Sequence, residues 1–177
     1  EPFANMRLLF GYQWLFPGKQ LLFMGGEIGQ RTEWNEDAEV PWELLEENEA
    51  HAGLQQWVAD LNHLYRDEPA LWAGDYSVGG FYWVDSVDHA ANVVSFVRQT
   101  PDASRQVLVL LNLGNMSHVG YRIGLPRAGW WREALNSDSE HYGGANLGNY
   151  GGVHSQETPW HSQPWSAEFN LPPLSCS

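Results

Sequence analysis

The runs NVVSFVR at residues 92–98 and QVLVLLNL at residues 106–113 decide the fold of most of this chain. Both are rich in β-branched and large apolar residues, and the segment between them carries Pro101 and Asp102, residue types that favour turns. Runs of similar composition lie on either side: Phe81–Val84, Val119–Ile123, Trp130–Leu135 and Trp165–Leu171. Because turn-forming residues separate all of these runs, the sequence predicts an all-β sandwich over residues 71–177.

Residues 1–70 have a different pattern of apolar residues. Apolar residues at helical spacing predict a buried helix over residues 3–16 and another near residues 51–66, just before Pro69. Between them, Gln20–Met24 (QLLFM) is short and apolar on both faces, which is typical of a strand inside a parallel sheet. The order of helix, buried strand, long acidic loop and helix matches part of an α/β barrel or a doubly wound sheet.

Two helices and one strand cannot close the core of a barrel, so we expect the partners of this segment to lie upstream in the same barrel. The predicted fold class is therefore α/β plus all-β. Its domains are the last strand and helices of a (β/α)8 barrel at residues 1–70, followed by the all-β sandwich domain at residues 71–177. The boundary is expected near Glu68–Ala73.

Charge and composition narrow the range of partners. Nine Lys and Arg residues against 22 Asp and Glu give a formal net charge of −13. Such a surface repels phosphate backbones and anionic lipids, so nucleic acid and membranes are poor partner candidates. The ten Trp and seven Tyr residues favour a carbohydrate partner modestly, because the C–H faces of a sugar ring stack on flat aromatic rings.

The expected location is the cytoplasm. The longest apolar stretch, Leu8–Phe16, is far shorter than the ~20 residues that span a bilayer, and no secretory signal pattern is present. The single cysteine, Cys176, excludes an intramolecular disulfide and fits a reducing compartment.

Two groups of motifs stand out. The first is Pro17–Glu27 followed by Glu33-Trp34-Asn35. The second is longer and more specific: Trp131-Arg132-Glu133, Asn136-Ser137-Asp138, Tyr142–Asn146, Gly148-Asn149, Gly151–Val153, Pro159–His161 and Leu171–Leu174. Both resemble bacterial glycogen (1,4-α-glucan) branching enzymes of the α-amylase superfamily, glycoside hydrolase family 13: the first is similar to the eighth barrel strand and its loop, and the second to the carboxy-terminal β-domain. Small departures, Gly26 and Ile28, affect local contacts of the first loop.

The resemblance implies a retaining transglycosylase that moves α-1,4-glucan segments to form α-1,6 branches. This chemistry needs a carboxylate nucleophile and an acid/base about 5–5.5 Å apart. In the family these groups lie on earlier barrel strands, and no His-Asp pair occurs in this sequence. We therefore expect no catalytic residue here. The acidic loop carboxylates are interpreted as surface charge. The seven histidines lack the spacing of a metal site, and we expect no metal and no cofactor.

Because we expect no catalytic residue in this sequence, the functional role considered for single residues is contact with the substrate. The candidate glucan-binding residues are Glu27, Trp34, Asn35, Trp160 and Trp165. Each has a structural alternative: Glu27 could cap its loop, Trp34 could anchor that loop, and the tryptophans of the β-domain could be core. Of Trp130 and Trp131, at most one can point outward, since neighbouring residues of a strand face opposite sides.

Four interpretations remain. The leading one is a branching-enzyme region that packs against its barrel and contacts glucan. The alternatives are a free-standing carbohydrate-binding β-sandwich, the C-terminal region of another enzyme of the superfamily, or a purely structural domain. Outward-facing rings at Trp160 and Trp165 would favour binding over a structural role.

Overall fold

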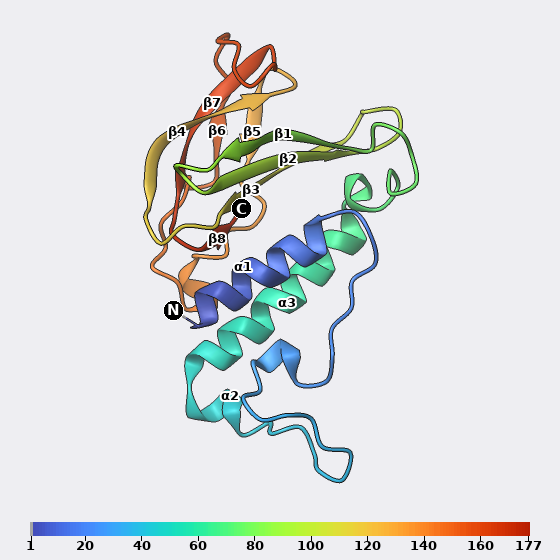
Figure 1. The fold of residues 1–177 in the computed structure, drawn as a ribbon, viewed down its shortest axis with the longest axis vertical. Coiled ribbons are helices and arrows are strands. Elements are labelled where there is room, and N and C mark those ends of the chain that lie inside the picture. The colour runs from blue at the N-terminus through green and yellow to red at the C-terminus, as the bar shows by residue number, and fades with distance from the viewer. Residues whose placement is uncertain (1) are drawn as a thin grey trace.

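A computed structural model describes residues 2–177. Two long helices lie side by side beneath an all-β region, and the loop that joins them extends away from the body of the molecule (Figure 1). The helical elements are α1 (Pro2–Leu15), η1 (Gly26–Ile28), α2 (Leu44–Glu47), α3 (Glu49–Asp67), η2 (Pro69–Leu71) and η3 (Glu140–Tyr142). The strands are β1 (Phe81–Asp88), β2 (Val93–Gln99), β3 (Gln106–Asn112), β4 (His118–Leu125), β5 (Trp130–Arg132), β6 (Gly152–His154), β7 (Trp165–Leu171) and β8 (Ser175–Cys176).

Local sequence explains where α3 begins and ends. The side chain of Asn48 accepts a hydrogen bond from the Ala50 N–H at 2.9 Å and caps the helix. Its apolar stripe, which includes Leu54, Trp57 and Leu61, is fully buried against α1 and the sheet. Pro69 stops it, because a proline has no N–H to continue the helical ladder.

The strand expected over Gln20–Met24 does not form. This segment has no regular secondary structure, and Leu21 and Phe23 are 80% and 64% exposed. A strand exists only where a neighbour accepts and donates its backbone hydrogen bonds, and within residues 2–177 no segment pairs with this one. That upstream barrel strands cover this segment stays a prediction.

Within residues 2–177, the β-region consists of one four-stranded antiparallel sheet and two two-stranded sheets. The order in the main sheet is β1-β2-β3-β8, while β4 pairs with β7 and β5 pairs with β6. β2 and β3 are paired over their full length, from Val93 opposite Asn112 to Gln99 opposite Gln106. The predicted runs correspond to β1, β2, β3, β4 and β7. The run predicted over residues 130–135 is regular only at β5, and β6 and β8 were not predicted.

Both faces of the main sheet are covered. Phe96, Val109 and Leu111 point into a core shared with α1 and α3. Their strand neighbours Val97 and Leu110 point the other way, into a core shared with β4 and β7. The helices and the β-region therefore pack on a common sheet, and the division at residues 68–73 stays a prediction about domain limits.

A buried arginine fastens the helical layer to the sheet. Arg98 of β2 donates to the carbonyl oxygens of Leu15 at 2.8 Å and Leu71 at 2.7 Å, and it pairs with the carboxylate of Asp75. The side chains of Arg98 and Asp75 are only 1% and 5% exposed. This single guanidinium thus donates hydrogen bonds to a carbonyl oxygen at the end of α1, to one in the turn after α3, and to a buried carboxylate.

Replacing Arg98 by Met should lower the free energy of unfolding by about 3–5 kcal/mol, because it leaves Asp75 buried without its counter-charge. Urea denaturation measures the change. Arg66→Met is the matched control, since Arg66 pairs with Asp67 on the surface and its loss should leave stability almost unchanged. Equal stability of the two variants would contradict this role for Arg98.

Candidate functional site

The loop residues proposed to contact substrate lie on an exposed segment. Trp34 is 43% exposed, and its ring meets that of Phe23 edge-on at 5.6 Å. The side-chain oxygen of Asn35 accepts a hydrogen bond from the Asp37 N–H at 3.0 Å and so forms a local turn. Glu27 lies half-buried in η1. Trp34 and Phe23 form an exposed aromatic pair.

A histidine that the sequence did not single out anchors this loop. The Nδ1 atom of His51, in α3, makes a buried hydrogen bond with the carbonyl oxygen of Ile28. The ring of Phe3 packs edge-on against the same imidazole. η1 is thereby held on the helical layer, although the segments on either side of it are exposed. The spacing of histidines in the sequence gives no signal for such a contact.

Trp160 borders a shallow cleft of about 480 Å³ on the surface of the β-region. Its side chain is 46% exposed. Tyr121, Arg122 and His161 are among the other residues that line the cleft. An accessible indole beside hydroxyl, guanidinium and imidazole groups is an arrangement that could bind a neutral polar ring by stacking and hydrogen bonding.

A tight hairpin presents Trp160. Trp160 and Gln163 exchange two backbone hydrogen bonds, and His161 and Ser162 between them have φ values of 49° and 58°. Positive φ at both central residues is the geometry of a type I′ turn. The hairpin lies directly on β4, because a Cβ at Gly124 would be 2.2 Å from the Trp160 carbonyl oxygen. Only glycine allows this approach.

The side chain of His161 holds the hairpin against β4 and β1. Its Nδ1 accepts a hydrogen bond from the Gly124 N–H at 3.3 Å, so a neutral ring carries its proton on Nε2. That Nε2 lies 3.4 Å from the carboxylate of Asp85 on β1. The imidazole therefore ties the hairpin to two strands, and the position of the Trp160 ring is set by the fold.

The polar groups beside Trp160 are also held in place. The Tyr121 hydroxyl donates to Asp88 at 2.6 Å, and this hydrogen bond lowers the pKa of that carboxyl. Burial, together with Asp88, raises the pKa of Tyr121, which stays a protonated donor. Arg122 pairs with Glu168 at 2.6 Å and donates to Gln156 at 2.9 Å. These groups are ordered before any ligand arrives.

Trp165 does not join this cleft. It lies on β7, half-buried, opposite Leu125 of β4, and packs against the core of the sandwich. Trp130 is 53% exposed, whereas Trp131 packs against the same core as Trp165. The structure therefore supports an accessible platform at Trp160 and a packing role for Trp165.

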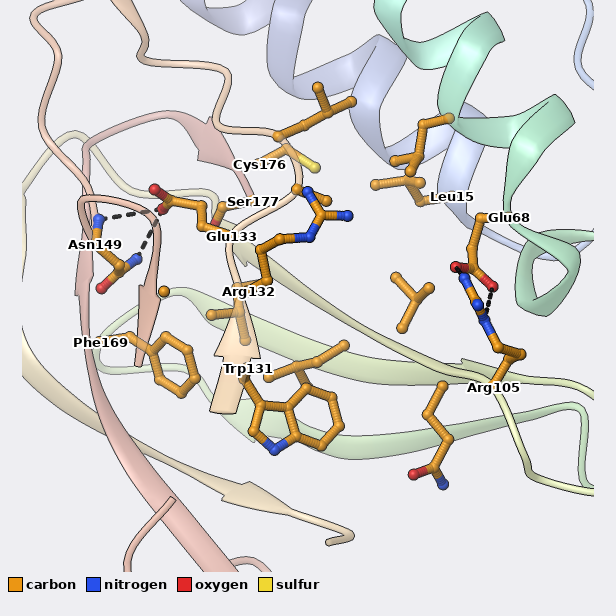
Figure 2. Close-up of a pocket in the computed structure, with 18 of the residues that line it drawn as sticks. Leu15, Glu68, Arg105, Trp131, Arg132, Glu133, Asn149, Phe169, Cys176 and Ser177 are labelled. Carbon is orange, nitrogen blue, oxygen red and sulfur yellow. Dashed lines mark hydrogen bonds and ion pairs between the residues drawn. The ribbon is translucent and has the colours of Figure 1, made fainter. Parts of the chain in front are cut away.

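A second cavity, of about 450 Å³, lies between the helices and the β-region (Figure 2). The Glu68–Arg105 ion pair lies at one end, and the hydrogen bonds from Asn149 to Glu133 lie at the other. Burial raises the pKa of Glu68, but the hydrogen bonds from Arg105 and the Ala70 N–H outweigh it and lower the pKa overall. The wall between these ends combines apolar side chains, among them Trp131, with the charged side chain of Arg132 (Figure 2).

Within residues 2–177, no group of three or more His, Cys, Asp or Glu side chains is placed to hold a metal ion. Over the same residues, no helix combines the length and hydropathy that crossing a bilayer requires.

Comparison with known proteins assigns the β-region to a family. The family described as "Alpha amylase, C-terminal all-beta domain" matches residues 83–177, which is more than half of the chain. The chain belongs to this α-amylase family. The matched segment holds most of the main sheet, β4–β7 and the Trp160 cleft.

Longer similarity extends this α-amylase match into the helices. The chain is 49% identical over 99% of its length to the 1,4-alpha-glucan branching enzyme GlgB of Aromatoleum aromaticum. It is 45% identical over 99% to that of Aquifex aeolicus, and 49% identical over 97% to that of Mycobacterium tuberculosis. The matches cover 27%, 28% and 23% of those proteins. The chain thus spans about a quarter of the length of these relatives.

Cys176 should be unreactive in the folded chain. It is fully buried, and burial raises the pKa of its thiol to about 12, so almost no thiolate forms near pH 8. Ellman's reagent should therefore label it only after unfolding in urea. A Ser117→Cys variant, with a second thiol in an exposed loop, is the control and should be labelled at once. Rapid labelling of native Cys176 would show that its segment opens.

Proposed function

We propose that this chain is the C-terminal region of a 1,4-α-glucan branching enzyme, which transfers α-1,4-glucan segments to form α-1,6 branches in glycogen biosynthesis. The observation that carries the proposal is the similarity of 45–49% over 97–99% of the chain to branching enzymes from three distant bacteria. The region itself serves packing and glucan contact, and the reaction takes place elsewhere in the whole protein.

Residues 1–70 would be the end of the (β/α)8 barrel of that protein. The support comes from apolar side chains without cover: Leu21, Phe23 and Met24 are all more than half exposed. Upstream barrel strands would pair with this segment and bury these side chains, since a parallel strand is covered on both faces. The chain covers 23%, 27% and 28% of the relatives, so the other roughly three quarters of such an enzyme would supply both these strands and the catalytic carboxylates.

Glucan contact is best supported at Trp160. A glucose ring presents C–H groups that stack on the indole, and its hydroxyls can reach Tyr121, Arg122 and His161 around the cleft. Trp34, Asn35 and Glu27 would form a second contact near the barrel rim. Trp165 would support the first contact only through packing. A neutral glucan is not repelled by a chain of net charge −13.

The same charge argues against nucleic acid and membranes as partners, and we propose a cytoplasmic location, where glycogen is made. A second candidate function is a free-standing carbohydrate-binding module. The ordered cleft at Trp160 favours this candidate, whereas the shared core of the helices and the main sheet favours a region built for a larger protein.

The chain alone should show no branching activity on amylose, because the nucleophile and the acid/base are proposed to lie upstream. Iodine-stain absorbance after incubation measures this, with a full-length branching enzyme as the positive control. A loss of absorbance that copurifies with the folded chain would contradict the assignment of chemistry to upstream residues.

Trp160→Ala should weaken binding of maltoheptaose to the chain by roughly tenfold, which corresponds to about 1.4 kcal/mol. Isothermal titration calorimetry measures the dissociation constant. Trp130→Ala is the matched control, because Trp130 is similarly exposed but lies on β5, outside the cleft. Equal affinities for the two variants would exclude the Trp160 cleft as a glucan site.

A further inference from the structure

The imidazole of His161 lies between a donor and an acceptor at the tip of the Trp160 hairpin, residues 160–163. Its Nδ1 accepts a hydrogen bond from the Gly124 N–H of β4 at 3.3 Å. Its Nε2 lies 3.4 Å from the carboxylate of Asp85 on β1. A neutral ring with its proton on Nε2 is complementary to both neighbours, because it accepts at one nitrogen and donates at the other.

A second proton changes the two contacts in opposite directions. An imidazolium carries N–H donors at both nitrogens, so Nδ1 would direct a hydrogen at the N–H of Gly124, which is also a donor. That hydrogen bond is then lost. The contact with Asp85 becomes stronger, because a charged donor now faces a carboxylate. Protonation therefore weakens the link from the hairpin to β4 and strengthens the link to β1.

The other charged or titratable groups around His161 permit this change. They are Asp85 and Asp88 of β1, His118, Tyr121 and Arg122 of β4, and Glu168 of β7, which pairs with Arg122. Tyr121 stays protonated and neutral, because burial and its hydrogen bond to Asp88 raise its pKa. The charges of Arg122 and Glu168 offset each other. The two aspartates outweigh His118, so an imidazolium at His161 is not repelled.

The tip of the hairpin depends on its contact with β4 because its turn is strained. His161 and Ser162 have φ values of 49° and 58°, and neither is glycine. Such conformations are uncommon for residues with a Cβ and persist where surrounding contacts hold them. The base of the segment is held separately, since Gln156 and Ser166 exchange backbone hydrogen bonds of 2.7 and 3.1 Å. Loss of the contact with β4 would therefore free the tip, which carries Trp160, and leave the base in place.

We propose that protonation of His161 releases the Trp160 hairpin from β4. The neutral imidazole holds the indole beside the cleft, and the imidazolium, attracted to Asp85, allows the tip to move away. Imidazole is the side chain whose charge ordinarily changes between about pH 5 and 8, so acidification within this range drives the release. Glucan affinity at the cleft should then fall with the pH. This last step rests on the glucan contact proposed above, whereas the release itself does not.

NMR spectroscopy measures the release without a ligand. The protection of the Gly124 amide from hydrogen exchange should fall at least about tenfold between about pH 8 and about pH 5, after correction for the intrinsic exchange rate. The indole N–H signal of Trp160, identified by its absence from Trp160→Ala, should shift with the same midpoint as the His161 ring. Amides of β2 are the internal reference and should stay protected. A Gly124 amide that stays protected while the His161 ring is protonated would overturn the proposal.

His161→Asn separates the titration of the ring from its hydrogen bond. The side-chain oxygen of asparagine stands one bond beyond Cγ, as Nδ1 does, so it can accept from the Gly124 N–H, and asparagine tolerates positive φ but does not titrate. The parent chain should bind maltoheptaose roughly tenfold more weakly at about pH 5 than at about pH 8, as if the indole were lost, whereas His161→Asn should show no such difference. His118→Gln is the matched control, since His118 is the other imidazole of the cleft, and it should keep the ratio of the parent.

Titration calorimetry at the two pH values distinguishes this proposal from the proposed glucan contact. Equal affinities of the parent at both pH values, an undiminished ratio in His161→Asn, or a ratio that disappears in His118→Gln would each overturn the switch and leave the glucan site in place. An absence of binding at either pH would exclude the glucan site, and the Gly124 amide would then decide the release by itself.

Discussion

Double burial of the β2–β3 pair is the constraint on which the rest of the structure depends. These two strands are apolar on both faces, so each face needs its own cover, and the cover comes from different parts of the chain. α1 and α3 lie on one face, and the β4–β7 pair lies on the other (Figure 1). The helices and the β-region therefore bury each other's apolar side chains. Arg98 joins the two layers through its hydrogen bonds to buried carbonyl oxygens.

The same constraint decides which aromatic side chains are accessible to a ligand and which are buried in a core. Wherever an aromatic side chain faces either core, as Phe96 and Trp57 do, it is unavailable to a ligand. Trp160 escapes because it lies on a hairpin outside the sheet pairs, held against Gly124 by backbone contact. The rigid Trp160 hairpin on the outside of the double core is therefore the place at which we propose glucan contact.

Much of the fold could be predicted from residue patterns because the patterns are local. Helical spacing over residues 51–66 and alternating or continuous apolar runs over residues 92–113 depend only on side chains a few positions apart. The motifs from Trp131 to Leu174 indicated the family through their resemblance to the C-terminal domain of branching enzymes. The run at Gln20–Met24 shows the limit. Its composition indicates burial on two faces, but burial needs partners, and a pattern cannot supply them.

The site depended on tertiary structure to a greater degree. From sequence, Trp160 and Trp165 were equal candidates, because both are tryptophans near turns in the same segment. Only the fold separates them: β7 carries Trp165 toward a core, while a positive-φ turn lifts Trp160 clear of it. What the sequence determined by itself was the two long helices, the strands β1–β4 and β7, and their order, since these follow from local periodicity and turn chemistry. The family followed from the resemblance of its motifs to those of branching enzymes. What only the tertiary structure decided was which faces meet, because burial, the Arg98 contacts and the contact of the Trp160 hairpin with Gly124 arise between residues far apart in the chain.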